Sequence, residues 1–215
     1  MKIIGINNEM HISSACLIED GKIVAAAAEE RFTREKLTRK FPLETIKYCF
    51  KEANIKMEEV DYIATSWNPG IYFTKFNPIY SGQRRHLVEQ LYSIPDNLMQ
   101  LYGRHEVDYV FQEISGDFGK AKIYYVTHHR THAANGFFLS PFSSAAILTA
   151  DAQGEFESTT FCHGQENKIK LIKSINYPHS LGVLYSTFTE FLGFKANSDE
   201  WKVMALASYY PNENI

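Results

Sequence analysis

The feature that most constrains this fold is a repeated order of expected strands and helices. Residues 3–53 alternate short apolar runs with turns and then take on a helical pattern, which predicts strand, turn, strand, turn, strand and helix. Residues 145–192 predict the same order later in the chain. The two segments share almost no sequence identity, so the repeat is one of element order. It indicates an α/β chain with two similar halves.

The expected elements can be placed by residue range. In the first half, an Asp-Gly hairpin signal at Asp20-Gly21 lies between the expected strands 13–18 and 23–28. The other expected strands are 3–6, 60–66, 122–126, 145–150, 156–163 and 168–175, and helices are expected from Leu43, over 127–139 and over 180–192, the last closed by Gly193. Residues 67–120 are less regular, with helices expected at 84–92 and 97–104. We therefore expect a first half of about 1–140 with an insertion near 67–120, and a second half starting near 141 and running to 215.

Composition excludes several classes of protein. The 215 residues are 45% hydrophobic and 22% charged, which is typical of a folded domain and not of a disordered chain. The net charge of −3 gives no indication of a nucleic-acid partner or an anionic membrane. Three scattered cysteines support neither a disulfide framework nor a cysteine zinc site. With no apolar run long enough for a signal core or a membrane span, we expect a soluble cytoplasmic protein.

A cluster of histidines is the best candidate for a metal site. His128 and His132 are four residues apart in an expected helix, which places their Cβ atoms about 5–6 Å apart on one face. Asp151 follows the apolar strand 145–150, at the rim of the sheet, and a carboxylate would suit iron, magnesium or manganese. The alternatives are a solvated helix start for the histidines and an ordinary Asp turn.

Two further segments are candidates for anion binding. His11 precedes the small residues Ser13 and Ser14, whose loop would let backbone N–H groups approach a phosphate. His11 could donate to that phosphate or act as an acid or base, or it is simply a polar loop residue. Lys36 belongs to a run of basic residues at 31–40 that could clamp a phosphate or a carboxylate. The alternative for this run is a solvated charged surface.

The repeated element order resembles a known architecture. A duplicated unit of three strands and a helix is similar to the actin-like ATPase fold of acetate kinase, sugar kinases, Hsp70 and actin. The resemblance implies the first half of that fold plus part of the second, with a nucleotide bound between the halves. In that fold the first hairpin of each half holds the phosphates. For the second half of this chain, the resemblance therefore implies that Gly154 and Glu155 lie near the phosphates.

Several ordered motifs make the resemblance more specific, pointing to the NodU/CmcH carbamoyltransferases and their Kae1-like N-terminal domain. The motifs are Gly5-Ile6-Asn7 with His11 and Ser14-Ala15, Ala28-Glu29-Glu30-Arg31-Phe32-Thr33-Arg34 with Lys36, His128-His129 with His132-Ala133-Ala134, Leu148-Thr149-Ala150-Asp151 with Gly154-Glu155, Pro178-His179-Ser180-Leu181-Gly182, and Leu192-Gly193-Phe194-Lys195 with Asn197-Ser198 and Glu200. Together they cover nearly the whole chain outside the 67–120 insertion.

This resemblance implies a function and a set of site residues. Members of the family transfer a carbamoyl group from carbamoyl adenylate, made from carbamoyl phosphate and ATP by a YrdC-like domain, to a hydroxyl of a sugar or a secondary metabolite. The implied metal ligands are His128, His132 and Asp151, with iron the expected ion and magnesium, manganese or zinc as alternatives. The implied catalytic residues are His11 and Lys36, and Ser13, Ser14, Gly154 and Glu155 would contact ATP or the adenylate.

Other functions remain open from the sequence. The YrdC-like domain is expected to be absent, so this chain alone would be an incomplete carbamoyltransferase. A second interpretation is a metal-binding module of the same fold that is non-catalytic or depends on a partner, either a separate chain carrying the YrdC-like domain or a second copy of itself. A third is a kinase of the same fold, which would not require the histidine pair.

Overall fold

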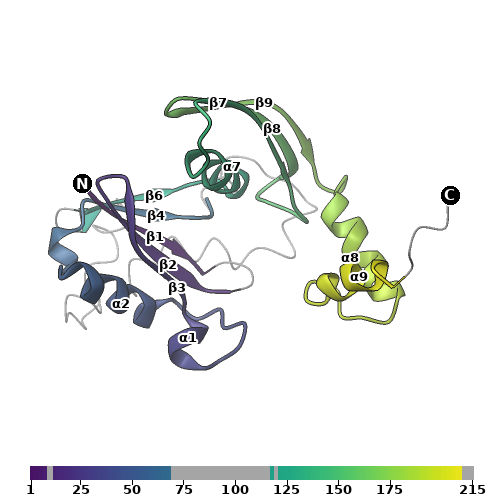
Figure 1. Ribbon diagram of the computed structural model, residues 1–215, viewed down its shortest axis with the longest axis horizontal. Helices are drawn as coiled ribbons and strands as arrows, with labels where there is room; N and C mark the ends of the chain where they lie inside the picture. Colours follow the sequence, from purple (N-terminus) through teal and green to yellow (C-terminus); the bar gives the residue numbers. More distant parts are fainter. Residues whose placement is uncertain (9–11, 69–116, 119–120, 210–215) are drawn as a thin grey trace. The chain divides into compact units, whose positions relative to one another are not determined.

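A computed structural model describes residues 1–8, 12–68, 117–118 and 121–209 of the chain (Figure 1). The chain divides into two compact units, Met1–His128 and His129–Ile215. The expected insertion near 67–120, including the helices expected at 84–92 and 97–104, lies almost entirely outside the described residues.

The first unit is built on a six-stranded mixed sheet with the strand order β3-β2-β1-β4-β6-β5. Its strands are β1 (Lys2–Asn7), β2 (Ser14–Glu19), β3 (Lys22–Ala28), β4 (Tyr62–Thr65), β5 (Asp117–Phe118) and β6 (Ala121–Tyr125). Strands β1, β2 and β3 form an antiparallel meander, whereas β4 pairs parallel with both β1 and β6. The β2–β3 turn has positive φ at both Asp20 (49°) and Gly21 (80°), as a tight hairpin of right-handed twist requires.

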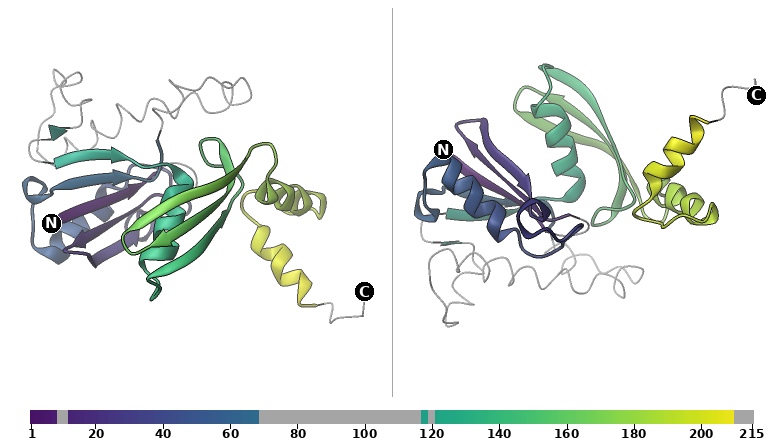
Figure 2. Two further views of the ribbon diagram at one scale, coloured as in Figure 1. Left: turned by 90° about the horizontal axis from the view of Figure 1, so that it is seen from above. Right: turned by 60° about the horizontal axis from the view of Figure 1, so that its bottom comes forward.

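A helix covers one face of this sheet. Three helical segments follow β3, namely α1 (Glu30–Thr33), α2 (Leu43–Ala53) and the 3-10 helix η1 (Met57–Glu59). Helix α2 packs on β2 and β3 (Figures 1 and 2). It contributes Ile46 to a core that also contains Ile4, Leu17 and Ile63, each with no exposed surface. Burial alternates along β2, so Ala15 and Leu17 face this core.

The second unit repeats the meander of the first. Its elements are α7 (His128–Phe138), β7 (Ser144–Ala150), β8 (Glu157–Gln165), β9 (Lys168–Asn176), α8 (Leu181–Phe191) and α9 (Glu200–Ala207). Strands β7, β8 and β9 form an antiparallel sheet in that order, matching β1, β2 and β3. Helix α7 lies along this sheet (Figure 2). A Cβ atom at Gly164 of β8 would lie 2.7 Å from the ring of Phe137, so glycine at this position leaves room for that ring.

Most expected elements are present within one or two residues of the predicted limits. Gly193 has φ +85° directly after α8, as expected for a helix C-terminus. The short elements α1, η1 and β5 and the helix α9 were not predicted, because short segments carry too few residues to show a period.

The strand order defines the fold class. An antiparallel meander followed by parallel strands added beside β1, with the meander then repeated in β7–β9, is the topology of the actin-like ATPase fold. The α/β prediction of a first half plus part of a second is confirmed. Among the described residues, no helix is both long enough and apolar enough to cross a membrane.

Candidate metal centre

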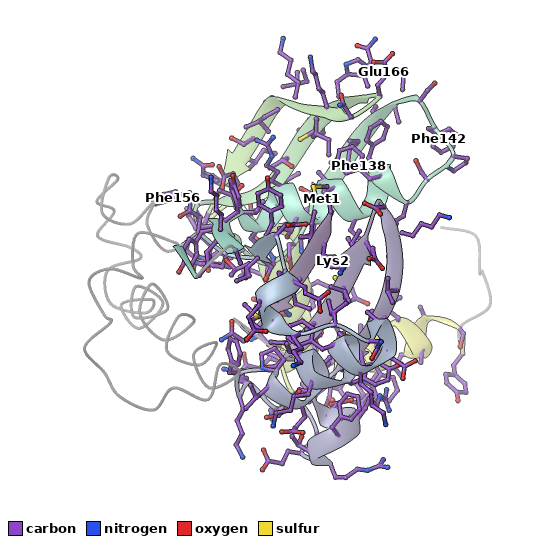
Figure 3. All side chains as sticks on the ribbon, turned by 90° about the vertical axis from the view of Figure 1, so that its left-hand side faces the viewer. Met1, Lys2, Phe138, Phe142, Phe156 and Glu166 are labelled. Atoms are coloured by element: carbon purple, nitrogen blue, oxygen red, sulfur yellow. The ribbon has the colours of Figure 1, made fainter. Side chains whose placement is uncertain are left out.

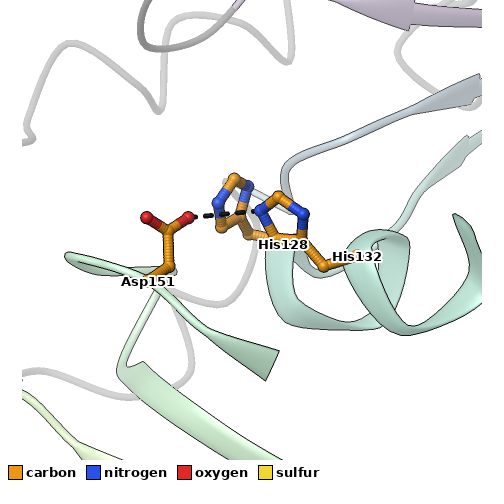
Figure 4. A group of neighbouring side chains, drawn as sticks. All are labelled: His128, His132 and Asp151. Carbon is orange, nitrogen blue, oxygen red and sulfur yellow. Dashed lines mark hydrogen bonds and ion pairs between the residues drawn. The ribbon is translucent and has the colours of Figure 1, made fainter. Parts of the chain in front are cut away.

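Helix α7 and the end of strand β7 bring three potential ligands together. His128 and His132 lie one turn apart on α7, and Asp151 follows the last residue of β7 (Figure 4). One nitrogen of each imidazole and one oxygen of the carboxylate all lie within 4.8 Å of one another. The three residues expected to be metal ligands are therefore gathered in one place.

The Asp151 carboxylate is oriented by two contacts. Its Oδ2 atom lies 3.2 Å from Nε2 of His132. Its Oδ1 atom accepts a hydrogen bond of 2.7 Å from the backbone N–H of Ala152. Oδ2 of Asp151 thus points toward His132, while Oδ1 is held by the backbone of the turn that begins at Asp151.

The donor set fits a divalent transition metal. Two imidazole nitrogens and one carboxylate oxygen form the set typical of non-haem iron(II) and also suit zinc. The side chains of His132 and Asp151 are 49% and 38% exposed, so solvent or a substrate can reach this group. These three residues could hold one ion and leave coordination positions open.

The ring of His128 packs against a buried tryptophan. The centroids of the Trp67 and His128 rings are 5.3 Å apart and the rings are tilted by 49°. Trp67 has no exposed surface, although it lies outside the main apolar cluster of the first unit. This contact restricts the orientations open to the His128 imidazole.

His129, which sequence reasoning left without a role, is a buried structural residue. It is 3% exposed, and its Nδ1 and Nε2 atoms lie 2.6 Å from Thr149 Oγ1 and 3.0 Å from the carbonyl oxygen of Glu157. It shares one buried helix face with Ala133 and Phe137. The spacing of four residues between His129, Ala133 and Phe137 could have indicated that His129 faces the protein interior. The spacing could not have indicated which residues its ring nitrogens contact.

The residues expected to handle phosphate lie mostly in the first unit. Ser13 is fully buried, and its hydroxyl has no hydrogen-bond partner among the described residues. Ser14 is the half-buried first residue of β2, and Lys36 is exposed in a turn after α1. His11 lies outside the described residues. The roles expected for these four residues remain predictions.

Gly154 and Glu155 belong to the turn that follows Asp151. The backbone N–H of Gly154 donates to the Glu157 carbonyl at 2.6 Å, so this group is engaged within the turn itself. Glu155 has no exposed surface. A nucleotide contact for either residue also remains a prediction.

Fold and site together define an α/β protein of the actin-like ATPase fold with a group of two histidines and one aspartate. Comparison with known proteins gives the family. The family described as carbamoyltransferase N-terminus matches residues 2–215, and the chain belongs to this family.

The chain is similar to longer curated proteins. It is 39% identical over 215 residues to an uncharacterized protein of Synechocystis, covering 96% of this chain and 34% of that protein. It is 34% identical over 205 residues to the nodulation protein NolNO of Sinorhizobium fredii, covering 94% of this chain and 28% of that one. The chain therefore spans about a third of the length of the curated relatives it matches.

Solved structures give weaker likenesses. YeaZ from Pseudomonas aeruginosa has a TM-score of 0.40 and 14% identity, covering 82% of this chain and 67% of that protein. The activator of 2-hydroxyisocaproyl-CoA dehydratase from Clostridium difficile has a TM-score of 0.45 and 9% identity, covering 100% and 59%.

Proposed function

We propose that this chain supplies the metal-binding acyl-transfer site of a carbamoyltransferase. The reaction would move a carbamoyl group from carbamoyl adenylate to a hydroxyl of a sugar or a secondary metabolite. In that step the carbamoyl carbon bonds to the acceptor oxygen, its bond to the phosphate oxygen of the adenylate breaks, and AMP leaves. The observation that carries the proposal is the convergence of His128, His132 and Asp151 in a member of the carbamoyltransferase N-terminus family.

Each group in the proposal has a physical task. His128, His132 and Asp151 would hold one divalent ion, iron in our preferred assignment, and such an ion supplies Lewis-acid polarisation of an oxygen in the reacting acyl phosphate. A base must accept the proton of the acceptor hydroxyl, and we assign this task to His11. Lys36, exposed on its turn, would pair with a phosphate of the adenylate.

The metal site can be tested without assaying the reaction. We expect the purified chain to bind one divalent ion per molecule, and the double variant His128→Ala/His132→Ala to lose it. His163→Ala is the matched control, since His163 is an exposed histidine on β8 outside this group. Elemental analysis after loading with iron(II) under anaerobic conditions gives the stoichiometry. Equal metal content in the wild type and the double variant would overturn the site.

One observation favours a second candidate, in which the chain acts only together with further polypeptide. Several large apolar side chains on the second unit are exposed, among them Phe138 and Phe142 (Figure 3) and a group on α8 and α9 that comprises Leu184, Phe188, Phe191, Trp201 and Met204. The α8 members repeat at helical spacing, so they form one face of that helix. A helix face that exposes several large apolar side chains is typical of an interface.

The occupant we assign to this surface is a separate polypeptide carrying the remainder of a full-length family member, including a YrdC-like domain. Mixing the chain with such a polypeptide should give a stable complex by size-exclusion chromatography and restore carbamoyl transfer. Self-association of the chain alone at micromolar concentration would indicate a homodimer instead. Full transfer activity by the isolated chain would contradict the need for a partner.

A further inference from the structure

We infer that the turn from Asp151 to Gly154 is held from two sides, by His129 of α7 and by Ser180 at the start of α8, and that these two are positioning residues for the Asp151 carboxylate. The inference rests on the proposed metal centre for its function. The effect of the two residues on the turn can be measured in the metal-free protein. Neither residue belongs to the ligand group itself.

On the first side, His129 ties the ligand-bearing helix to β7 and β8. Its Nδ1 atom lies 2.6 Å from the hydroxyl of Thr149, two residues before Asp151 on β7. Its Nε2 atom lies 3.0 Å from the carbonyl oxygen of Glu157, the first residue of β8. Because His129 follows His128 directly on α7, this pair of contacts fixes the rotation of the helix that also presents His132.

The partners determine which ring nitrogen carries the hydrogen. The Glu157 carbonyl can only accept, so Nε2 of His129 carries a hydrogen, and in the neutral ring Nδ1 then accepts. The hydroxyl of Thr149 therefore donates to the ring, and its oxygen accepts from the hydroxyl of Thr160 at 2.6 Å. His129, Thr149 and Thr160 are at most 7% exposed, so this directional chain is shielded from water.

The turn itself lies directly against the His129 ring. A Cβ atom added at Gly154 would come within 2.7 Å of His129 Cδ2 and 3.2 Å of the Glu157 carbonyl oxygen. Contacts of that length require one of the partners to move. Glycine at position 154 is thus what allows the turn to approach the ring.

On the second side, the start of α8 contacts the backbone of the same turn. The hydroxyl of Ser180 lies 2.6 Å from the carbonyl oxygen of Ala152 and 3.1 Å from that of Asp151. The same oxygen caps α8 by accepting from the N–H of Val183 at 3.0 Å. A Cβ atom at Gly182 would lie 2.4–2.6 Å from backbone atoms of Asp151 and Ala152. Helix α8 therefore fits the turn closely.

Both sets of contacts act on the atoms that aim the carboxylate. Ser180 contacts the carbonyl oxygen of Asp151, which belongs to the same peptide group as the Ala152 N–H that donates to Asp151 Oδ1. A shift of this peptide would rotate the carboxylate away from His132. Outer groups that orient metal ligands in this way typically change metal affinity by about 10- to 100-fold when removed.

A glycine variant with a matched control tests the close approach of α8 to the turn at Asp151 and Ala152. We expect Gly182→Ala to weaken Co²⁺ binding, measured by calorimetry, by about 10-fold or more. Gly136→Ala is the matched control, because a Cβ at that position on α7 meets nothing within 4 Å. The control should bind Co²⁺ as the wild type does. Equal affinity in Gly182→Ala and Gly136→Ala would contradict the inference.

Side-chain variants test the two named residues. Ser180→Ala should lose Co²⁺ affinity, and Ser180→Thr, which keeps the hydroxyl, should retain it. His129→Leu should also lose affinity, while Phe137→Leu, on the same buried face of α7, should lower stability without changing affinity. A loss in Phe137→Leu as large as that in His129→Leu would show that His129 acts only through general stability.

A measurement on the metal-free protein separates this inference from the proposed function. The Asp151 N–H donates to the Ser158 carbonyl and the Gly154 N–H to that of Glu157, so hydrogen exchange reports on the turn. We expect faster exchange across residues 151–154 in His129→Leu and Ser180→Ala than in Phe137→Leu. If the wild type binds no metal but exchange rises as expected, the metal site fails and the positioning stands. Unchanged exchange in both variants would overturn the positioning.

Discussion

The carboxylate of Glu29 accepts hydrogen bonds from both the backbone N–H and the hydroxyl of Thr45, at 2.8 and 2.7 Å. It also accepts from the N–H of Glu44 at 3.1 Å. Glu29 is 2% exposed, and it thereby caps the first turn of α2, where the helix leaves N–H groups without partners. In the sequence, Glu29 belongs to the 28–34 motif without a role of its own, and the structure shows that it is a helix cap.

Replacing Glu29 should therefore destabilise the first unit. We expect Glu29→Ala to lower the free energy of unfolding by about 2–3 kcal/mol, since three hydrogen bonds to a buried charged group are lost. Urea unfolding followed by circular dichroism measures the change. Glu52→Ala, at an exposed position on the same helix, should change stability by less than about 0.5 kcal/mol. A similar small effect for both variants would show that the cap contributes little.

A buried thiol should make stability depend on alkaline pH. Cys49 has no exposed surface, and burial raises the pKa of its thiol to about 11 from an ordinary value of 9.0. Between pH 9 and 11 the folded chain keeps this proton while the unfolded chain releases it, so the free energy of unfolding falls as pH rises. The loss is on the order of 2 kcal/mol across that window.

Unfolding in urea at several pH values between 8 and 10.5 measures this dependence. The variant Cys49→Ala should be less stable at neutral pH because of the cavity it leaves, but its stability should fall less steeply over the alkaline window. Comparing slopes separates the thiol from the tyrosines and lysines that titrate in the same range. Identical slopes in the two proteins would contradict the assignment.

The isolated chain should not make carbamoyl adenylate. The chain tested spans about a third of the length of the curated relatives it matches, and under the proposed function a separate YrdC-like domain makes the adenylate. Incubation with carbamoyl phosphate and ATP should therefore release pyrophosphate at the rate of a blank without protein. Release well above the blank, retained after repeated purification, would contradict this prediction.

Nucleotide should bind weakly to the isolated chain. Of the four residues expected to contact nucleotide, Ser13 and Glu155 have no exposed surface and the N–H of Gly154 is engaged within its own turn. Few groups are therefore available to bind phosphate, and contacts that remain exposed to water and salt are weak. We expect AMP to bind with a dissociation constant of about 1 mM, near −4 kcal/mol. Calorimetry with AMP, with and without metal, is the measurement. A micromolar constant would show that a nucleotide site is complete within these residues or within a pair of copies.

The sequence by itself predicted most of the elements and the grouping of His128, His132 and Asp151. Strands such as β7 and helices such as α8 follow from apolar periodicity, which depends on residues a few positions apart. The pair of His128 and His132 was predictable for the same reason, since one helical turn separates them. Asp151 was predictable because a charged residue directly after an apolar strand lies at a sheet rim.

The tertiary structure decided which neighbouring residues support that group. His129 and Glu29 lie in sequence beside a proposed metal ligand and a charged residue, yet each is buried and bonded to residues 15 to 28 positions away. The sequence indicates only that Ser180 caps a helix. The structure adds that its hydroxyl also contacts the turn 28 residues earlier. Such partners are chosen by chain packing, because a buried polar group must find hydrogen bonds wherever the fold brings them. The spacing of neighbouring residues in the sequence does not indicate these long-range partners.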